Sequence, residues 1–70
     1  MMSGIEKEIV LAFAKNNMSK TKTATELYRH RNTVIYHLEK IQKSFGLDPQ
    51  NFYDLIKLVE IAKGGVEPCD

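Results

Sequence analysis

The side chains best suited to chemistry lie in one short stretch, His30-Arg31-Asn32-Thr33, with Tyr36 three residues further on. Arginine and asparagine carry hydrogen-bonding forks, which pair with the edges of guanine and adenine in the major groove of DNA. A threonine or tyrosine at this spacing can reach a phosphate or a thymine methyl group. The stretch therefore predicts base contacts by Arg31, Asn32, Thr33 and Tyr36.

A second polar stretch, Ser19-Lys20-Thr21-Lys22-Thr23, precedes an apolar pattern and holds two cations and three hydroxyls. Together with the free backbone N–H groups of a helix start, these groups suit a phosphate. The alternative is that the hydroxyls only cap and solvate the helix. We expect phosphate contacts from this stretch and from later cations, at Ser19, Lys20, Thr21, Lys22, His30, Lys40 and Lys43.

The net charge of +1 disfavours a nucleic-acid-binding protein, but the charge is unevenly distributed along the chain. Residues 15–43 have a balance of +5, whereas residues 1–14 sum to −1 and residues 44–70 to −3. This segregation indicates an electrostatic surface for an anionic partner. On charge alone, a solvated polar surface explains it equally well.

The residue pattern argues against catalysis and metal binding. His30 and His37 stand seven residues apart, and no Cys, Asp or Glu completes a ligand set at suitable spacing. The chain has no recognisable nucleophile and base pair, glycine-rich phosphate loop or paired acids. We therefore expect no enzyme, no metal and no cofactor, and we expect His30 to be the N-cap or turn residue of the helix after it.

The length of 70 residues allows one domain with a small core. The single cysteine, Cys69, cannot form an internal disulfide, which fits a reducing, cytoplasmic setting. The N-terminus is polar and acidic before any apolar run, and no apolar stretch approaches the roughly 20 residues of a membrane span, so we expect neither a signal peptide nor a membrane partner. A domain over residues 1–63 and a flexible tail over 64–70 are predicted.

The positions of these groups depend on the helices that carry them, and the periodicity predicts an all-α domain of four helices. The first helix should start at Ser3 as N-cap and end near Asn16-Asn17, and the second should run from Ser19 as N-cap to about Tyr28. No period-two run of β-branched residues follows, so we expect no β-hairpin wing. The inward side of the first helix is predicted to hold Ile5, Ile9, Leu11, Ala12 and Phe13.

The third and fourth helices have clearer boundaries in the sequence. The third should begin near His30 or Arg31 and end at Gly46, with Val34, Leu38, Ile41 and Phe45 on its inward side. For the fourth, Asp48 is predicted as N-cap, Pro49 as first helical residue, and Leu47 and Phe52 as a hydrophobic staple. Its inward side is predicted to hold Phe52, Leu55, Ile56, Val59 and Ala62.

The second and third helices together have the residue pattern of a helix-turn-helix. Ala24 lets the two helices approach closely, and Leu27, Val34 and Leu38 pack around it, although any helical hairpin could carry the same pattern. With Val34 directed inward, Asn32, Tyr36, Glu39 and Lys43 fall on the opposite face. We predict a helix-turn-helix over Ser19–Ser44 with a recognition helix over about Arg31–Ser44.

The residues of this motif resemble the C-terminal helix-turn-helix of the PucR/CdaR family of purine-catabolism and sugar-diacid regulators. The similarity spans about Val10 to Ala62, is most specific at His30-Arg31-Asn32-Thr33, and extends more distantly to the factor-for-inversion-stimulation group. The resemblance implies a sequence-specific transcription factor that binds double-stranded DNA as a dimer and normally carries a larger N-terminal sensory region. These 70 residues are then either a piece of such a regulator or a short stand-alone relative. Arg29 stands where the family usually has an aliphatic residue, and Ile35 stands where it usually has a basic one. The operator sequence therefore cannot be transferred from relatives.

Two other functions fit parts of the chain. The fourth helix has more apolar residues than one helix of such a domain needs to bury, which suggests a helical protein-interaction or dimerisation module without base-specific readout. A homodimer through the first or fourth helix is compatible with DNA binding. RNA is a weaker candidate, because Tyr28 and Tyr36 stand alone in the basic segment. The apolar excess comprises Phe52, Tyr53, Leu55, Ile56, Leu58 and Val59.

Overall fold

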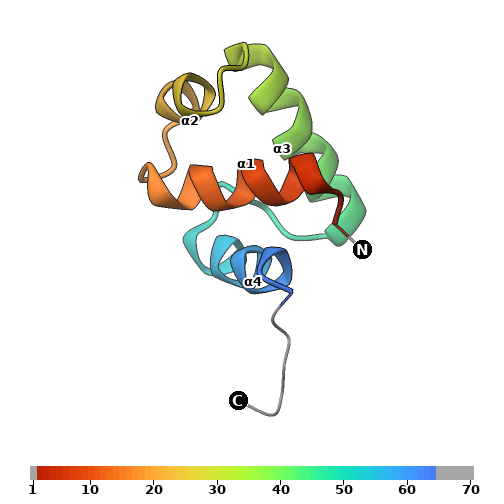
Figure 1. Cartoon of the computed structure of the whole chain (residues 1–70). Helices are drawn as coiled ribbons and strands as arrows, with labels where there is room; N and C mark the ends of the chain where they lie inside the picture. The colour runs from red at the N-terminus through yellow and green to blue at the C-terminus, as the bar shows by residue number, and fades with distance from the viewer. Residues whose placement is uncertain (1, 65–70) are drawn as a thin grey trace.

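The computed structural model describes residues 2–64 and contains four helices in that range (Figure 1). No strand occurs among those residues, so the predicted all-α, four-helix fold is confirmed. Helix α1 crosses the middle of the molecule, with α2 and α3 on one side and α4 on the other. The predicted tail falls outside the described residues from position 65 onward. The helices are α1 (Gly4–Lys15), α2 (Lys20–Glu26), α3 (Arg31–Phe45) and α4 (Phe52–Ala62).

Helix α1 begins with a capping box. The Glu6 backbone N–H donates to Ser3 Oγ at 3.3 Å, and the Ser3 N–H donates to Glu6 Oε1 at 2.9 Å, which satisfies two N–H groups that a helix start would otherwise leave unpaired. The predicted N-cap is therefore confirmed, as is the end at Asn16. The predicted inward side needs correction, because Val10 is fully buried while Ile5 and Leu11 are only partly buried. Since α1 contacts all three other helices, its buried face is wider than one stripe.

Helices α2 and α3 begin at the predicted caps. The Lys22 N–H donates to Ser19 Oγ at 3.1 Å at the start of α2, and His30 is the N-cap of α3. Helix α3 ends at Gly46, whose φ of 68° lies in the left-handed region that glycine adopts without steric cost. The predicted bounds of this helix are thus correct to within one residue.

The predicted start of α4 is wrong. Asn51, not Asp48, is the N-cap, and its Oδ1 accepts the N–H groups of Tyr53 and Asp54 at 3.0 and 3.2 Å. Asp48 instead accepts the N–H of Gln50 at 2.9 Å in a separate turn. The side chain of Pro49 is fully buried below that turn. Asp48 and Pro49 thus belong to the turn before the helix, and α4 begins three residues later than predicted.

The side of α4 that faces inward also differs from the prediction. Leu55, Leu58 and Ala62 are buried, whereas Phe52 and Ile56 are exposed and Val59 is half-buried. The predicted staple between Leu47 and Phe52 is not formed as a buried contact, since 61% of the Phe52 surface stays exposed. Prediction thus failed for Phe52 and Ile56, and it missed Leu58 as a core residue.

The core lies where the other helices meet α1. Ile9, Val10 and Phe13 of α1 are almost completely buried, together with Val34 and Ile41 of α3 and Leu58 of α4. Helices α2 and α3 pack on each other and on α1, whereas α4 packs on α1. Within residues 2–64, no helix has the length and apolar character that crossing a membrane would require.

Candidate nucleic-acid interface

Helices α2 and α3 pack as the sequence predicts for a helix-turn-helix. Ala24 of α2 is 5% exposed, and Val34 and Leu38 of α3 are 0% and 2% exposed. Leu27, at the end of α2, is half-buried beside them. Because alanine has only a methyl group, the backbones can approach closely at this point. The packing leaves the opposite side of α3 to solvent.

The turn between α2 and α3 contains a feature that the sequence did not reveal. Tyr28 has a φ of 56° and is 97% exposed. Tyrosine rarely adopts this left-handed conformation, because its Cβ then lies close to the following carbonyl oxygen. The turn is closed by the Arg29 N–H, which donates to the Ala24 carbonyl at 2.9 Å. No local signal in the sequence marks Tyr28 as a left-handed residue.

His30 caps α3 through its ring. Its Nδ1 accepts the Asn32 backbone N–H at 3.0 Å, and the side chain is otherwise exposed. In a neutral imidazole whose Nδ1 is an acceptor, the proton is on Nε2. The ring therefore offers an N–H donor to solvent at the start of α3. Prediction of His30 as a cap is confirmed.

The four residues predicted to contact bases lie on the first two turns of α3. Arg31 and Asn32 are exposed, Tyr36 is 58% exposed, and Thr33 is half-buried. The Tyr36 ring meets the ring of His37 edge-on, with centroids 5.2 Å apart and an angle of 73° between the planes. The structure thus brings these polar side chains together at one end of one helix.

Apart from His30, the residues predicted to contact phosphate form two groups. One is at the start of α2, where Thr21 and Lys22 are exposed and Ser19 and Lys20 are half-buried. The Ser19 hydroxyl already accepts a backbone N–H, so for this residue the capping interpretation is observed. The second group is on the later turns of α3, where Lys40 and Lys43 are exposed.

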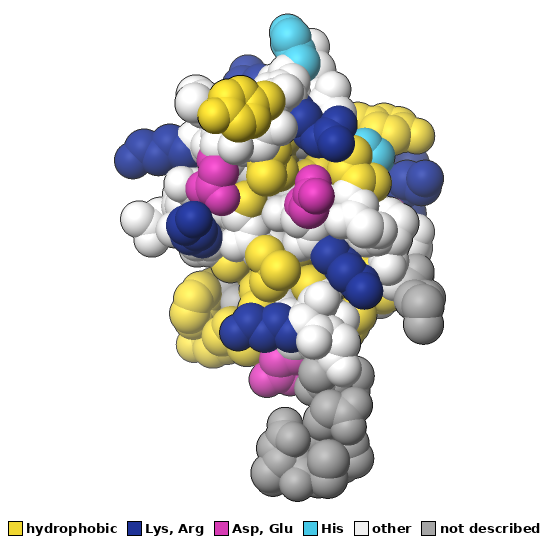
Figure 2. Space-filling view, viewed as in Figure 1, with side chains coloured by type: hydrophobic (Ala, Val, Ile, Leu, Met, Phe, Trp, Pro, Cys, Tyr) yellow, Lys and Arg dark blue, Asp and Glu magenta, His cyan; other side chains and the backbone are white. Residues whose placement is uncertain are grey.

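Among residues 2–64, the cations of α2 and α3 form no ion pair with an acidic side chain outside their own helices or within them. In the part of the chain that the structure describes, the one ion pair joins Lys15 and Glu26 at 3.4 Å. Figure 2 shows Lys and Arg side chains distributed over the face that is in view. The cations of α2 and α3 can therefore bind an anion without first breaking an ion pair. Over the same residues, no three His, Cys, Asp or Glu side chains gather in a way that could hold a metal ion.

Comparison with known proteins relates the chain to transcription regulators. Residues 7–59 match the family of PucR C-terminal helix-turn-helix domains. The carbohydrate diacid regulator of Escherichia coli (strain K12) is 34% identical over 56 residues, which cover 80% of this chain and 14% of that protein. The chain thus spans a small part of that relative's length. No solved structure gives a significant match.

Proposed function

The chain belongs to the family of PucR C-terminal helix-turn-helix domains, and from that membership we propose that it reads specific sequences of double-stranded DNA with α3 in the major groove. Family membership by itself implies DNA binding by a regulator domain. The observation that carries the finer proposal is the exposure of Asn32 and Tyr36 on the side of α3 opposite the buried Val34, with Arg31 exposed beside them as the first residue of the helix. The domain acts by binding, without a cofactor.

Base readout is assigned to the first two turns of α3. Arg31 pairs with guanine through O6 and N7, and Asn32 pairs with adenine through N6 and N7. Thr33 and Tyr36 contact a thymine methyl group or a neighbouring phosphate. Ile35, which is half-buried, adds a methyl contact at most.

Phosphate contacts hold α3 in register. Lys20, Thr21 and Lys22 at the start of α2 bind one strand, and His30 donates its Nε2 proton to a phosphate at the start of α3. Ser19 contributes through the helix start that it caps. Lys40 and Lys43 bind the backbone further along the groove. Each phosphate that is neutralised adds about 0.9 to the slope of affinity against salt concentration.

The domain is further proposed to act in the cytoplasm as a homodimer through the first or fourth helix, under the control of a sensory region outside this chain. The coverage of only 14% of the diacid regulator supports the last point. A protein-interaction module without base readout is the second candidate, and the exposure of Phe52, Tyr53 and Ile56 on α4 favours it.

Selection from a random duplex library, followed by fluorescence anisotropy with the selected duplex, tests the proposed readout. We expect binding that exceeds binding to a scrambled duplex and to a polyanion of equal charge, at low and at moderate salt. Equal affinity for the selected duplex, the scrambled duplex and the polyanion would mean that binding is electrostatic only, and would overturn the sequence-specific function. Absence of binding at either salt would favour the protein-interaction module.

A further inference from the structure

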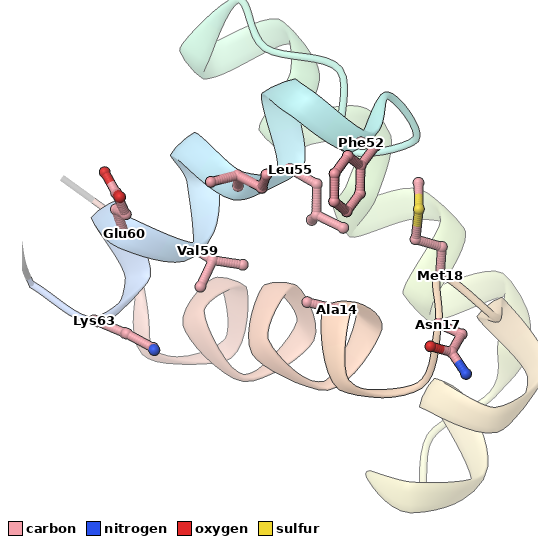
Figure 3. A pocket seen from close by; sticks show the side chains of 9 residues that line it. Ala14, Asn17, Met18, Phe52, Leu55, Val59, Glu60 and Lys63 are labelled. Carbon is pink, nitrogen blue, oxygen red and sulfur yellow. The ribbon is translucent and has the colours of Figure 1, made fainter.

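A groove of about 480 Å³ lies between the end of α1 and the exposed side of α4 (Figure 3). Ala14 and Met18 line it from the α1 side, and Leu55 and Val59 line it from α4. Met18 has a φ of 64°, so a non-glycine residue occupies the left-handed region at the edge of the groove. The base-contact residues proposed above lie on α3 and do not line it.

The rim of the groove is unusually apolar for a surface. Three of the exposed large hydrophobic side chains in the described part of the chain lie in the first five residues of α4. Phe52 is 61% exposed, Tyr53 is 74% exposed and Ile56 is 43% exposed. Phe52, Ile56, Val59 and Lys63 line the groove at spacings of four, three and four. This is the stripe of one helix face, and it fits a partner that is itself a helix.

The two ends of the groove differ in chemistry. Figure 3 shows Phe52 and Met18 at one end, and Glu60 and Lys63 at the other. Two copies of α4 in antiparallel orientation would bring Lys63 of each copy to the Phe52 end of the other. An ammonium group over an aromatic ring is attracted by the ring's quadrupole. A parallel pair would instead place the two Lys63 ammonium groups together.

We propose that this groove binds α4 of a second copy of the chain, antiparallel about a two-fold axis. The inference rests on the proposed function, since a helix-turn-helix that reads two half-sites needs two copies. It goes further by assigning the contact to the α1–α4 groove. Because α4 packs on α1 and not on α3, the contact leaves the DNA-facing side of α3 open.

The dimer is expected to be weak in the absence of DNA. A standard stable interface involves about 20–30 residues on each side, which is more than the exposed part of α4 and the end of α1 can supply. Two half-sites on one duplex raise the effective concentration of one copy for the other. Affinity for a two-site duplex should therefore depend on the groove, and affinity for a single half-site should not.

Sedimentation equilibrium of the full chain, from micromolar to millimolar concentration, tests the contact. The wild type should associate, and Ile56→Glu should raise the dimer dissociation constant about ten-fold or more, because it places an unpaired charge in the interface. Gln42→Glu, which makes the same charge change at an exposed position of α3, should associate like the wild type. Circular dichroism confirms that each variant is folded.

Cross-linking tests the orientation. Phe52→Cys and Lys63→Cys are made separately in a Cys69→Ser background and mixed under mild oxidation. An antiparallel pair predicts mainly the mixed disulfide, since equivalent positions would be separated by about 16 Å along the helix axis, too far for a bridge. The mixed pair also keeps one intact Phe52–Lys63 contact. Predominant self-linked disulfides would overturn the antiparallel arrangement.

The outcomes separate this inference from the proposed function. A chain that binds a selected duplex but stays monomeric at all concentrations and on a two-site duplex would overturn the groove contact alone. A chain that associates through the groove but shows no sequence preference would overturn the DNA readout alone. An Ile56→Glu variant that binds a single half-site normally and loses affinity for the two-site duplex supports both.

Discussion

Asn16 donates its side-chain amide to the Glu26 carboxylate at 2.9 Å, which ties the end of α1 to the end of α2. The same amide also donates to the Ala12 carbonyl at 2.8 Å, so Asn16 is held by its own helix while it holds α2. Lys15 adds a longer contact to Glu26, at 3.4 Å. This cluster adds a polar contact between α1 and α2 beside the buried packing of Ala24.

The Glu26 contact predicts a pH dependence of stability. The Asn16 hydrogen bond lowers the pKa of Glu26, desolvation opposes this, and the charge of Lys15 and its hydrogen bond lower the pKa further. Because the pKa is lower in the folded state, the stabilisation is present above the unfolded pKa and is lost as the pH falls through the folded pKa. In the Glu26→Gln variant, the urea midpoint of unfolding should therefore change less with pH in the acid range than it does in the wild type.

The effect of Glu26 should be small, since the carboxylate is exposed to solvent. Glu39→Gln provides the control, because Glu39 is an exposed glutamate on α3 outside this cluster. If Glu39→Gln reduced the pH dependence of the urea midpoint at acid pH as much as Glu26→Gln does, the dependence would reflect the overall charge of the domain and not the Asn16–Glu26 contact.

Replacement of Asn51 by alanine tests the start of α4. Asn51 Oδ1 accepts two backbone N–H groups, whereas Asp48 Oδ1 accepts one in a separate turn. Asn51→Ala should lower the free energy of unfolding by about 0.5–2 kcal/mol, as expected for loss of an N-cap. Asp48→Ala should cost less. Urea unfolding of both variants gives the order, and the reverse order would make Asp48 the true cap.

Much of the fold follows from signals within a few residues. Ser3, Ser19, His30 and Gly46 end or begin their helices as predicted, because each acts on backbone groups next to it in the chain. The start of α4 could not be predicted in this way, because Asp48-Pro49 and Asn51 are both local signals for a helix start. The side of α4 that is buried depends on packing against α1, which buries Leu58 and leaves Phe52 exposed.

The candidate interface could be predicted in part. With Val34 buried, the helical period alone exposes Asn32 and Tyr36, and the structure agrees. Arg31 is exposed because it is the first residue of α3. The α1–α4 groove could not be predicted, because it depends on how two helices far apart in sequence approach each other. The left-handed Met18 beside it has no local signal either.

Tyr28 is predicted to carry a steric cost that glycine would relieve. Its φ is 56°, and its side chain is 97% exposed, so Tyr28→Gly should lose little packing. Relief of the left-handed strain, less the greater freedom of glycine in the unfolded chain, should raise the free energy of unfolding by up to about 1 kcal/mol. Thermal unfolding measures the change. Arg29→Gly, one residue later, should destabilise the domain; stabilisation by both would indicate general loosening of the turn.

Substitutions in α2 and α3 should affect DNA binding differently. Arg31→Ala and Asn32→Ala should each cost about 1–3 kcal/mol on the selected duplex and relax the preference at one base pair. Lys22→Ala should weaken all duplexes alike and reduce the salt slope by about 0.9. Anisotropy titrations on selected and scrambled duplexes at several salt concentrations measure both quantities. Equal losses on both duplexes for all three variants would contradict the assigned roles.

Helix α4 packs on α1, on the side away from α2 and α3. Residues on the outer side of α4 can therefore change without moving Arg31 or Asn32. Under the proposed roles of α3 and α4, mutations that alter which copies pair with each other and mutations that alter which operator is read would fall on separate sets of positions. A gene duplication could in this way yield two regulators that keep one operator and no longer form mixed dimers.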